Sequence, residues 1–119
     1  MHFQTPPYNH AKIVHVIKGS VTDVVLDLRK SSITYGQFIE YNLDYKNNEA
    51  IYIPSGCAHG FKTLEDDTTM IYLVTSEYNK EHDSGVKWNS IGYDWNIENP
   101  IISERDNNFV ELKDFVSPF

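Results

Sequence analysis

Residues 53–61, IPSGCAHGF, place a single histidine, His59, shortly after a Pro-Ser-Gly turn and between the small residues Ala58 and Gly60. Small neighbours leave an imidazole room to face a cavity, where it can bind a metal or line a pocket. The structural alternative is a buried histidine that is hydrogen-bonded to a backbone carbonyl. This stretch alone leaves these interpretations open.

The pattern Pro54-x-Gly56-x-x-His59 resembles the second half of a cupin metal motif, in which a turn presents a histidine into a barrel. Such a site needs three or four suitable ligands that converge at bonding distance. The first half of the motif would supply an H-x-H pair just after a glycine, and then a glutamate. The stretch after Gly19, SVTDVVLDLR, contains no histidine. We therefore expect no metal and no other cofactor.

The elements that position His59 are strand-like almost throughout, and no segment shows a sustained helical period. Strands are predicted in 12–28, 37–43, 50–54 and 68–78, with a hairpin at Gly19-Ser20 and with Met70, Tyr72 and Val74 on one strand face. Short strands separated by polar turns favour an all-β fold, either a cupin-like antiparallel β-barrel or a double-sheet jelly roll. Residues 79–108 are less regular and predict a loop-rich C-terminal tail that wraps the barrel.

Length and composition narrow the class of protein. A chain of 119 residues forms one domain, residues 1–119, and its single cysteine, Cys57, favours a reducing cytoplasm. No apolar run approaches the roughly 20 residues of a membrane span, and the N-terminus lacks the pattern of a signal peptide. The net charge of −7 argues against nucleic acid as a partner. A membrane is likewise not expected as a partner.

Several motifs occur together in the order and approximate spacing of one family. They are MHFQTPP, AKIVHVIKGSVTDVVLDLR, YGQF, YIPSGCAHGF, YLVTSEY, GVKWNSIGYDW and ISERD. The chain resembles the dTDP-4-dehydrorhamnose 3,5-epimerases, which are metal-free cupin-fold isomerases, over nearly its whole length. The resemblance implies a homodimer that inverts carbons 3 and 5 of a nucleotide-diphosphate-linked 4-keto-6-deoxyhexose, in deoxysugar and surface polysaccharide biosynthesis.

The resemblance assigns removal of the proton next to the ketone to three residues. His2 in MHFQ corresponds to the family's catalytic base, and Asp106 in ISERD to the carboxylate that orients it. Lys12 corresponds to the lysine that stabilises the enolate. Removing a proton next to a ketone requires such a base and such a stabilising group. Read without the family, Lys12 is an exposed strand end and Asp106 caps a turn.

The resemblance places Tyr72 on the opposite face of the sugar and assigns two further residues to substrate binding. Tyr72 corresponds to the residue that returns the proton, Tyr78 to a contact with the phosphate region, and His59 to a contact near the sugar and diphosphate. Read without the family, Tyr72 and Tyr78 share one strand parity and both face a core. The joint occurrence of these residues favours function over packing.

The sequence departs from the family pattern at its start. Family members carry further residues before the motif that contains His2, including a phosphate-binding arginine. We expect either a natural short form with a changed substrate, or a fragment or mis-started reading. Two alternatives to the 3,5-epimerase therefore stay open. One is epimerisation at a single carbon or on another nucleotide carrier, and the other is a non-catalytic cupin that binds a sugar nucleotide.

Overall fold

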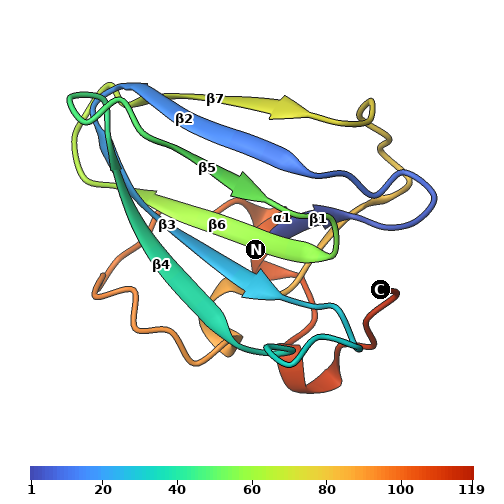
Figure 1. Ribbon diagram of the computed structural model, residues 1–119. Helices are drawn as coiled ribbons and strands as arrows, with labels where there is room; N and C mark the ends of the chain where they lie inside the picture. The colour runs from blue at the N-terminus through green and yellow to red at the C-terminus, as the bar shows by residue number, and fades with distance from the viewer.

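The computed structural model describes residues 1–119, and two antiparallel β-sheets face each other in it as two layers (Figure 1). The five-stranded sheet has the order β4-β3-β6-β1-β8, and the three-stranded sheet has the order β5-β2-β7. The strands are β1 (His2–Gln4), β2 (Lys12–Lys18), β3 (Ser20–Asp27), β4 (Phe38–Asp44), β5 (Ala50–Ile53), β6 (Cys57–Thr63), β7 (Thr69–Val74) and β8 (Asp83–Gly85). The expected all-β jelly roll is confirmed.

Helical structure is confined to three short pieces of the C-terminal tail. They are η1 (Trp88–Ser90), α1 (Glu104–Asn107) and η2 (Leu112–Asp114). No helix is long and apolar enough to cross a membrane. The loops between these pieces run along the outer face of the five-stranded sheet, as the orange and red segments of Figure 1 show. The predicted loop-rich tail is therefore present and covers one sheet.

Strand β3 is buried on both faces because a different layer packs on each. Val21 and Val25 belong to a core between the two sheets, whereas Val24 and Leu26 belong to a core between the five-stranded sheet and the tail. This alternation follows from the period of two residues in a strand. It also places Asp23, which shares the parity of Val21 and Val25, in the space between the sheets.

The predicted hairpin at Gly19-Ser20 is wrong. Strands β2 and β3 lie in different sheets, and only Gly19 separates them. A hairpin loop commonly needs two residues, so one residue cannot fold β3 back onto β2. Gly19 instead has a φ of +75° and turns the chain from one layer to the other. An added Cβ there would clash with the backbone and side chain of Thr68, so glycine is required.

Candidate active site

A cavity of about 760 Å³ is lined by β1, β2, β6, β7 and the tail. Five residues predicted to act in the site line it: His2, Lys12, His59, Tyr72 and Asp106. The sixth, Tyr78, lines an adjoining cavity of about 270 Å³, which also contacts His2, Lys12 and Tyr72. The structure thus brings together residues from both ends of the chain, such as His2 and Asp106.

Strand pairing explains why these side chains meet. His2 on β1 lies directly opposite His59 on β6, so both point to the same face of the five-stranded sheet. On the other sheet, Tyr72 lies opposite the buried Val14, so Tyr72 faces inward. Lys12 is two residues before Val14 and shares its face. The predicted parity of Tyr72 is therefore confirmed.

The candidate base, His2, lies against the candidate orienting acid. His2 Nε2 is 3.0 Å from Asp106 Oδ1, although no well-directed hydrogen bond reaches that oxygen. Burial lowers the pKa of His2, as does the Met1 amino group, while Asp106 acts in the opposite direction. Burial raises the pKa of Asp106, but its interaction with His2 and the nearby positive charges outweigh this, and the pKa falls below its usual value. The pair thus combines a neutral imidazole with an ionised carboxylate near pH 7.

Asp106 is held in place by the start of α1. Ser103 is the N-cap of this helix, and its side-chain oxygen accepts a hydrogen bond of 3.1 Å from the backbone N–H of Asp106. Asp106 therefore sits in the first helical turn, with its carboxylate turned toward His2. The alternative in which Asp106 itself caps a turn is wrong, since Ser103 has that role.

His59 belongs to a second histidine–carboxylate pair that sequence reasoning missed. His59 Nδ1 lies 3.1 Å from Asp23 Oδ2 and 3.2 Å from Asp23 Oδ1, and both residues are buried. The carboxylate accepts from Nδ1, which leaves Nε2 with a free lone pair. Burial lowers the pKa of His59 more strongly than Asp23 raises it. The signal for Asp23 was its place in β3, where it shares the inward-facing parity of Val21 and Val25, because a buried charge needs a partner.

Lys12 is a mostly buried cation between these two pairs. Its Nζ donates to the backbone carbonyl of His2 at 3.4 Å. Burial lowers the pKa of Lys12 to about 8, and the negative charges of Asp23 and Asp83 counter part of this effect. At neutral pH the ammonium group is therefore charged but poorly hydrated, as a group that stabilises an oxyanion should be.

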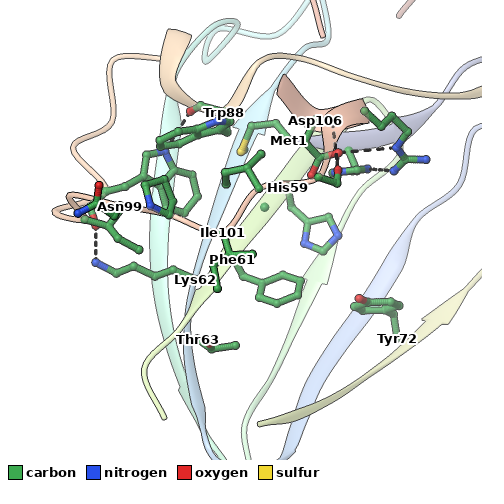
Figure 2. Close-up of a pocket in the computed structure, with 18 of the residues that line it drawn as sticks. Met1, His59, Phe61, Lys62, Thr63, Tyr72, Trp88, Asn99, Ile101 and Asp106 are labelled. Atoms are coloured by element: carbon green, nitrogen blue, oxygen red, sulfur yellow. Dashed lines mark hydrogen bonds and ion pairs between the residues drawn. The ribbon is translucent and has the colours of Figure 1, made fainter. Parts of the chain in front are cut away.

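Tyr72 faces this cluster from the other sheet. Its ring makes an edge-on contact with the ring of His59, with centroids 6.0 Å apart. Figure 2 shows His59 between Asp106 on one side of the cavity and Tyr72 on the other. Burial raises the pKa of Tyr72, so its hydroxyl keeps its proton at neutral pH. A protonated phenol opposite a neutral imidazole is an acid facing a base.

Tyr78 lies outside the strand on which it was expected. Because β7 ends at Val74, the shared strand parity predicted for Tyr72 and Tyr78 is wrong. Tyr78 is 67% exposed, and its hydroxyl donates to Asp83 Oδ2 at 3.3 Å. Asp83 also accepts from Arg105, another residue that sequence reasoning missed. Arg105 lies in the motif ISERD next to Asp106, so it could have been found there.

The remaining wall of the larger cavity is apolar and aromatic. Trp88 and Trp95 pack edge to face with centroids 6.2 Å apart, and Phe61 and Ile101 extend this wall (Figure 2). The indole nitrogen of Trp88 is buried without a hydrogen-bond partner. The wall therefore offers apolar and aromatic area, which is typical of a pocket for an organic ligand. No three His, Cys, Asp or Glu side chains are grouped so that they could hold a metal ion.

The fold and the site together define a jelly-roll domain with an acid–base pocket between its sheets. The family model for dTDP-4-dehydrorhamnose 3,5-epimerase matches residues 1–114. The chain belongs to this family.

Individual relatives agree with this membership. The dTDP-4-dehydrorhamnose 3,5-epimerase of Shigella flexneri is 37% identical over 98% of this chain and 67% of its own. The crystal structure of the Bacillus anthracis str. Ames enzyme with TDP and PPi bound has a TM-score of 0.91 at 39% identity, covering 93% of this chain and 65% of that one. The crystal structure of ChmJ, a 3'-monoepimerase from Streptomyces bikiniensis, in complex with dTDP-quinovose has a TM-score of 0.88 at 31% identity. The match covers 94% of this chain and 58% of ChmJ.

The matches do not extend over the whole of these relatives. The chain spans 67%, 57% and 64% of the length of three curated relatives from Shigella flexneri, Sinorhizobium fredii and Methanothermobacter thermautotrophicus. The shared part contains every residue that forms the cavity described above.

Proposed function

We propose that the protein is an isomerase that inverts carbon 3, carbon 5 or both in a nucleotide-diphosphate-linked 4-keto-6-deoxyhexose. The observation that carries this proposal is the pairing of a base and an acid from opposite sheets. His2 with Asp106 and Tyr72 with His59 line one cavity, and Lys12 lies between them. Family membership supports the same reaction, within the synthesis of a deoxysugar for surface polysaccharide.

The proposed reaction begins on the His2 side. The neutral imidazole takes the proton from a carbon next to the ketone, and the electrons of the C–H bond pass into an enolate. Asp106 stabilises the imidazolium that forms, since their atoms are 3.0 Å apart. The Lys12 ammonium stabilises the negative charge on the enolate oxygen. These three residues thus lower the barrier to breaking the C–H bond.

Tyr72 completes the inversion from the other side. Its hydroxyl delivers a proton to the same carbon on the opposite face, which leaves a phenolate. The imidazolium returns its proton to solvent, and the phenolate regains one, so protons balance over a cycle. Proton delivery from a face other than that of removal is what inverts the carbon. A binding-only protein has no need for an acid and a base on opposite sides.

The nucleotide-diphosphate portion of the substrate is proposed to extend past the sugar toward Tyr78 and Arg105. Tyr78 is largely exposed beside the smaller cavity, and Arg105 lies on the wall of the larger one. A cation and a phenol that are both accessible to solvent fit the oxygens of a diphosphate. His59 lies deeper, where it contacts the sugar end of the ligand.

Deuterium incorporation tests the proposal directly. Incubation of dTDP-4-keto-6-deoxyglucose with the protein in heavy water should place deuterium at carbon 3, carbon 5 or both, because the enolate is quenched by solvent-derived protons. Mass spectrometry and NMR of the product locate the label. A protein that binds the sugar nucleotide but exchanges neither position would contradict the enzyme and support the binding-only alternative.

A single-carbon epimerase is a second candidate. The specific observation in its favour is the match to ChmJ, described as a 3'-monoepimerase, over 94% of this chain. The two candidates share the same base and acid, so they differ in how the sugar ring turns in the pocket. Deuterium at one carbon only, after prolonged incubation, would select this candidate over the 3,5-epimerase.

The pH dependence of the reaction should report Lys12. Its pKa of about 8 lies below the ordinary value, so the ammonium is present below that pH and lost above it. Activity that depends on this charge should therefore fall as the pH rises through about 8. Tyr72 does not lose its proton in this window, since its pKa is raised. Measurement of kcat/KM from pH 6 to 10 checks this.

The variant Lys12→Arg tests whether loss of the Lys12 charge causes the fall in activity above pH 8. Lys12→Arg keeps a positive charge throughout the range, because a guanidinium does not lose its proton in proteins. Its activity should be lower because of the altered geometry, but flat above pH 8. If wild type were flat to pH 10, Lys12 would not supply the charge that stabilises the enolate.

We further propose that the protein is a homodimer that pairs through the outer face of the three-stranded sheet. Ile13, Tyr52 and Leu73 are neighbours on this face and are 43%, 67% and 65% exposed. Contiguous apolar area of this kind typically marks an interface. A cytoplasmic location is proposed as well, since the only cysteine, Cys57, is a free buried thiol.

Leu73→Lys should weaken the proposed dimer. The substitution removes apolar area and places a charge in the interface, so we expect dissociation to become about 10- to 100-fold easier. Sedimentation equilibrium measures the change. Ile33→Lys is the control, because Ile33 is 97% exposed and lies in the loop before β4, away from this face. A Leu73→Lys protein with unchanged self-association would place the interface elsewhere.

A further inference from the structure

Both ring nitrogens of His2 are occupied in the absence of substrate. Arg105 Nη2 lies 2.7 Å from His2 Nδ1, while Nε2 faces Asp106. A guanidinium can only donate, so Nδ1 must be the acceptor in this contact. The ring proton of the neutral imidazole is then on Nε2, next to the carboxylate. The only lone pair with which His2 can act as a base is therefore covered by Arg105.

Arg105 is held in this position from several sides, yet it stays accessible. Its other terminal nitrogen donates to Asp83, and its guanidinium lies 5.7 Å from the ring centroid of Phe109. The ring of Phe109 also contacts His2 edge-on, at 5.4 Å between centroids. The Arg105 side chain is 51% exposed and lines the larger cavity. An anionic ligand can therefore reach it without opening the core.

We propose that Arg105 is a displaceable cap on the catalytic base, and that the anionic diphosphate end of the substrate unmasks His2 by drawing the guanidinium away from Nδ1. The inference rests on the proposed function for its substrate, and it adds a regulatory step to that site. Arg105 binds the diphosphate, but it affects proton removal only through His2 and is a positioning residue for that step. Its effect is to keep the base inactive until the charged part of the ligand has bound.

Asp83 holds both of the side chains that are expected to bind the diphosphate, Arg105 and Tyr78. Its Oδ2 accepts from Arg105 and, at 3.3 Å, from the hydroxyl of Tyr78. A diphosphate that takes hydrogen bonds from Tyr78 and Arg105 competes with this one carboxylate oxygen for both donors. Binding at the exposed end of the pocket therefore loosens the hold on Arg105 and frees His2. Charge-assisted hydrogen bonds to phosphate oxygens are strong enough to compensate for the contacts that are lost.

Removing Arg105 should raise the pKa of His2. Other titratable groups share the two cavities with His2, namely the Met1 amino group, His10, Lys12, His59, Lys62, Tyr72, Tyr78, Asp83 and Asp106. They remain when only Arg105 changes. Arg105 lowers the pKa of His2 by its charge, and its hydrogen bond to Nδ1 favours the neutral ring. Loss of the guanidinium therefore favours the protonated imidazole.

The first test follows the titration of His2 by NMR of the ¹⁵N-labelled full chain. Arg105→Gln should raise the pKa of His2 by about one unit, and Arg105→Lys should raise it by less. Lys113→Gln is the control for loss of one positive charge, since Lys113 is 73% exposed on η2 and pairs with Glu111. A His2 midpoint in Arg105→Gln equal to that of wild type would overturn the cap.

The second test adds inorganic pyrophosphate as the anionic probe. In wild type, the pKa of His2 should rise through two effects, the nearby anion and the release of Arg105 from Nδ1. In Arg105→Gln only the direct effect remains, so the rise should be clearly smaller. Equal rises in the two proteins would show that the anion acts on His2 without Arg105, and would overturn the unmasking. Neither readout requires turnover, so failure of the epimerase proposal is detected separately by the deuterium assay.

Discussion

His2→Ala should reduce deuterium incorporation into the keto sugar by about 10⁴-fold, at the upper limit for loss of one general base. The change removes the imidazole that takes the proton. The backbone pairing of β1 with β6 and β8 does not depend on this side chain, so the fold should persist. Exchange rates are measured by NMR at saturating sugar nucleotide, which separates loss of chemistry from loss of binding.

A second histidine supplies the matched control. His15→Ala should retain wild-type exchange, because His15 hydrogen-bonds to the Glu49 carbonyl at an exposed site that lines neither cavity. The residual rate of His2→Ala is informative as well, since His59 Nε2 carries a free lone pair in the same cavity. Exchange within about tenfold of wild type in His2→Ala would show that His59 with Asp23, rather than His2, removes the proton.

The strands could be predicted from the sequence because short runs of alternating β-branched and aromatic residues between polar turns favour an extended backbone. The stretch 37–43 became β4, and 50–54 became β5. The partner of each strand could not be predicted in the same way. Gly19 is compatible with both a hairpin and a crossing between layers, and only the packing of all eight strands decides between them. Local pattern fixes the type of an element, whereas long-range packing fixes its neighbours.

In the candidate site, too, local sequence pattern indicated single residues but not which of them lie next to each other. The spacing of single motifs could not bring His2 next to Asp106, because nothing in either stretch refers to the other. The family resemblance supplied that pair, and the structure places the two side chains in contact. Arg105 and Asp83 were missed because both fall in the stretch 79–108 that was predicted as loops, where charged residues are mostly solvated, whereas the structure places them in α1 and β8. Asp23 could have been recognised from the sequence alone, as a charge that shares the strand parity of Val21 and Val25 and needs a buried partner.

Tyr72→Phe should separate proton removal from inversion. The substitution removes only the hydroxyl, so the edge-on ring contact with His59 at 6.0 Å is retained and the pocket keeps its shape. His2 can still remove a proton and return a deuteron on its own face. Exchange with retention should therefore survive, while net inversion falls by about 10²- to 10⁴-fold. The product is analysed by NMR for label and configuration at each carbon.

The ratio of exchange to inversion distinguishes the role of Tyr72 from simple loss of packing. A packing defect would lower both rates together, whereas loss of the acid lowers only inversion. Tyr45→Phe provides the control, because Tyr45 is 45% exposed just after β4 and lines neither cavity, and both rates should stay at wild-type levels. Inversion that persists in Tyr72→Phe at the wild-type rate would require another donor on that side. His59 would be the candidate, since its ring contacts that of Tyr72 edge-on, and Asp23 would then stabilise its protonated form.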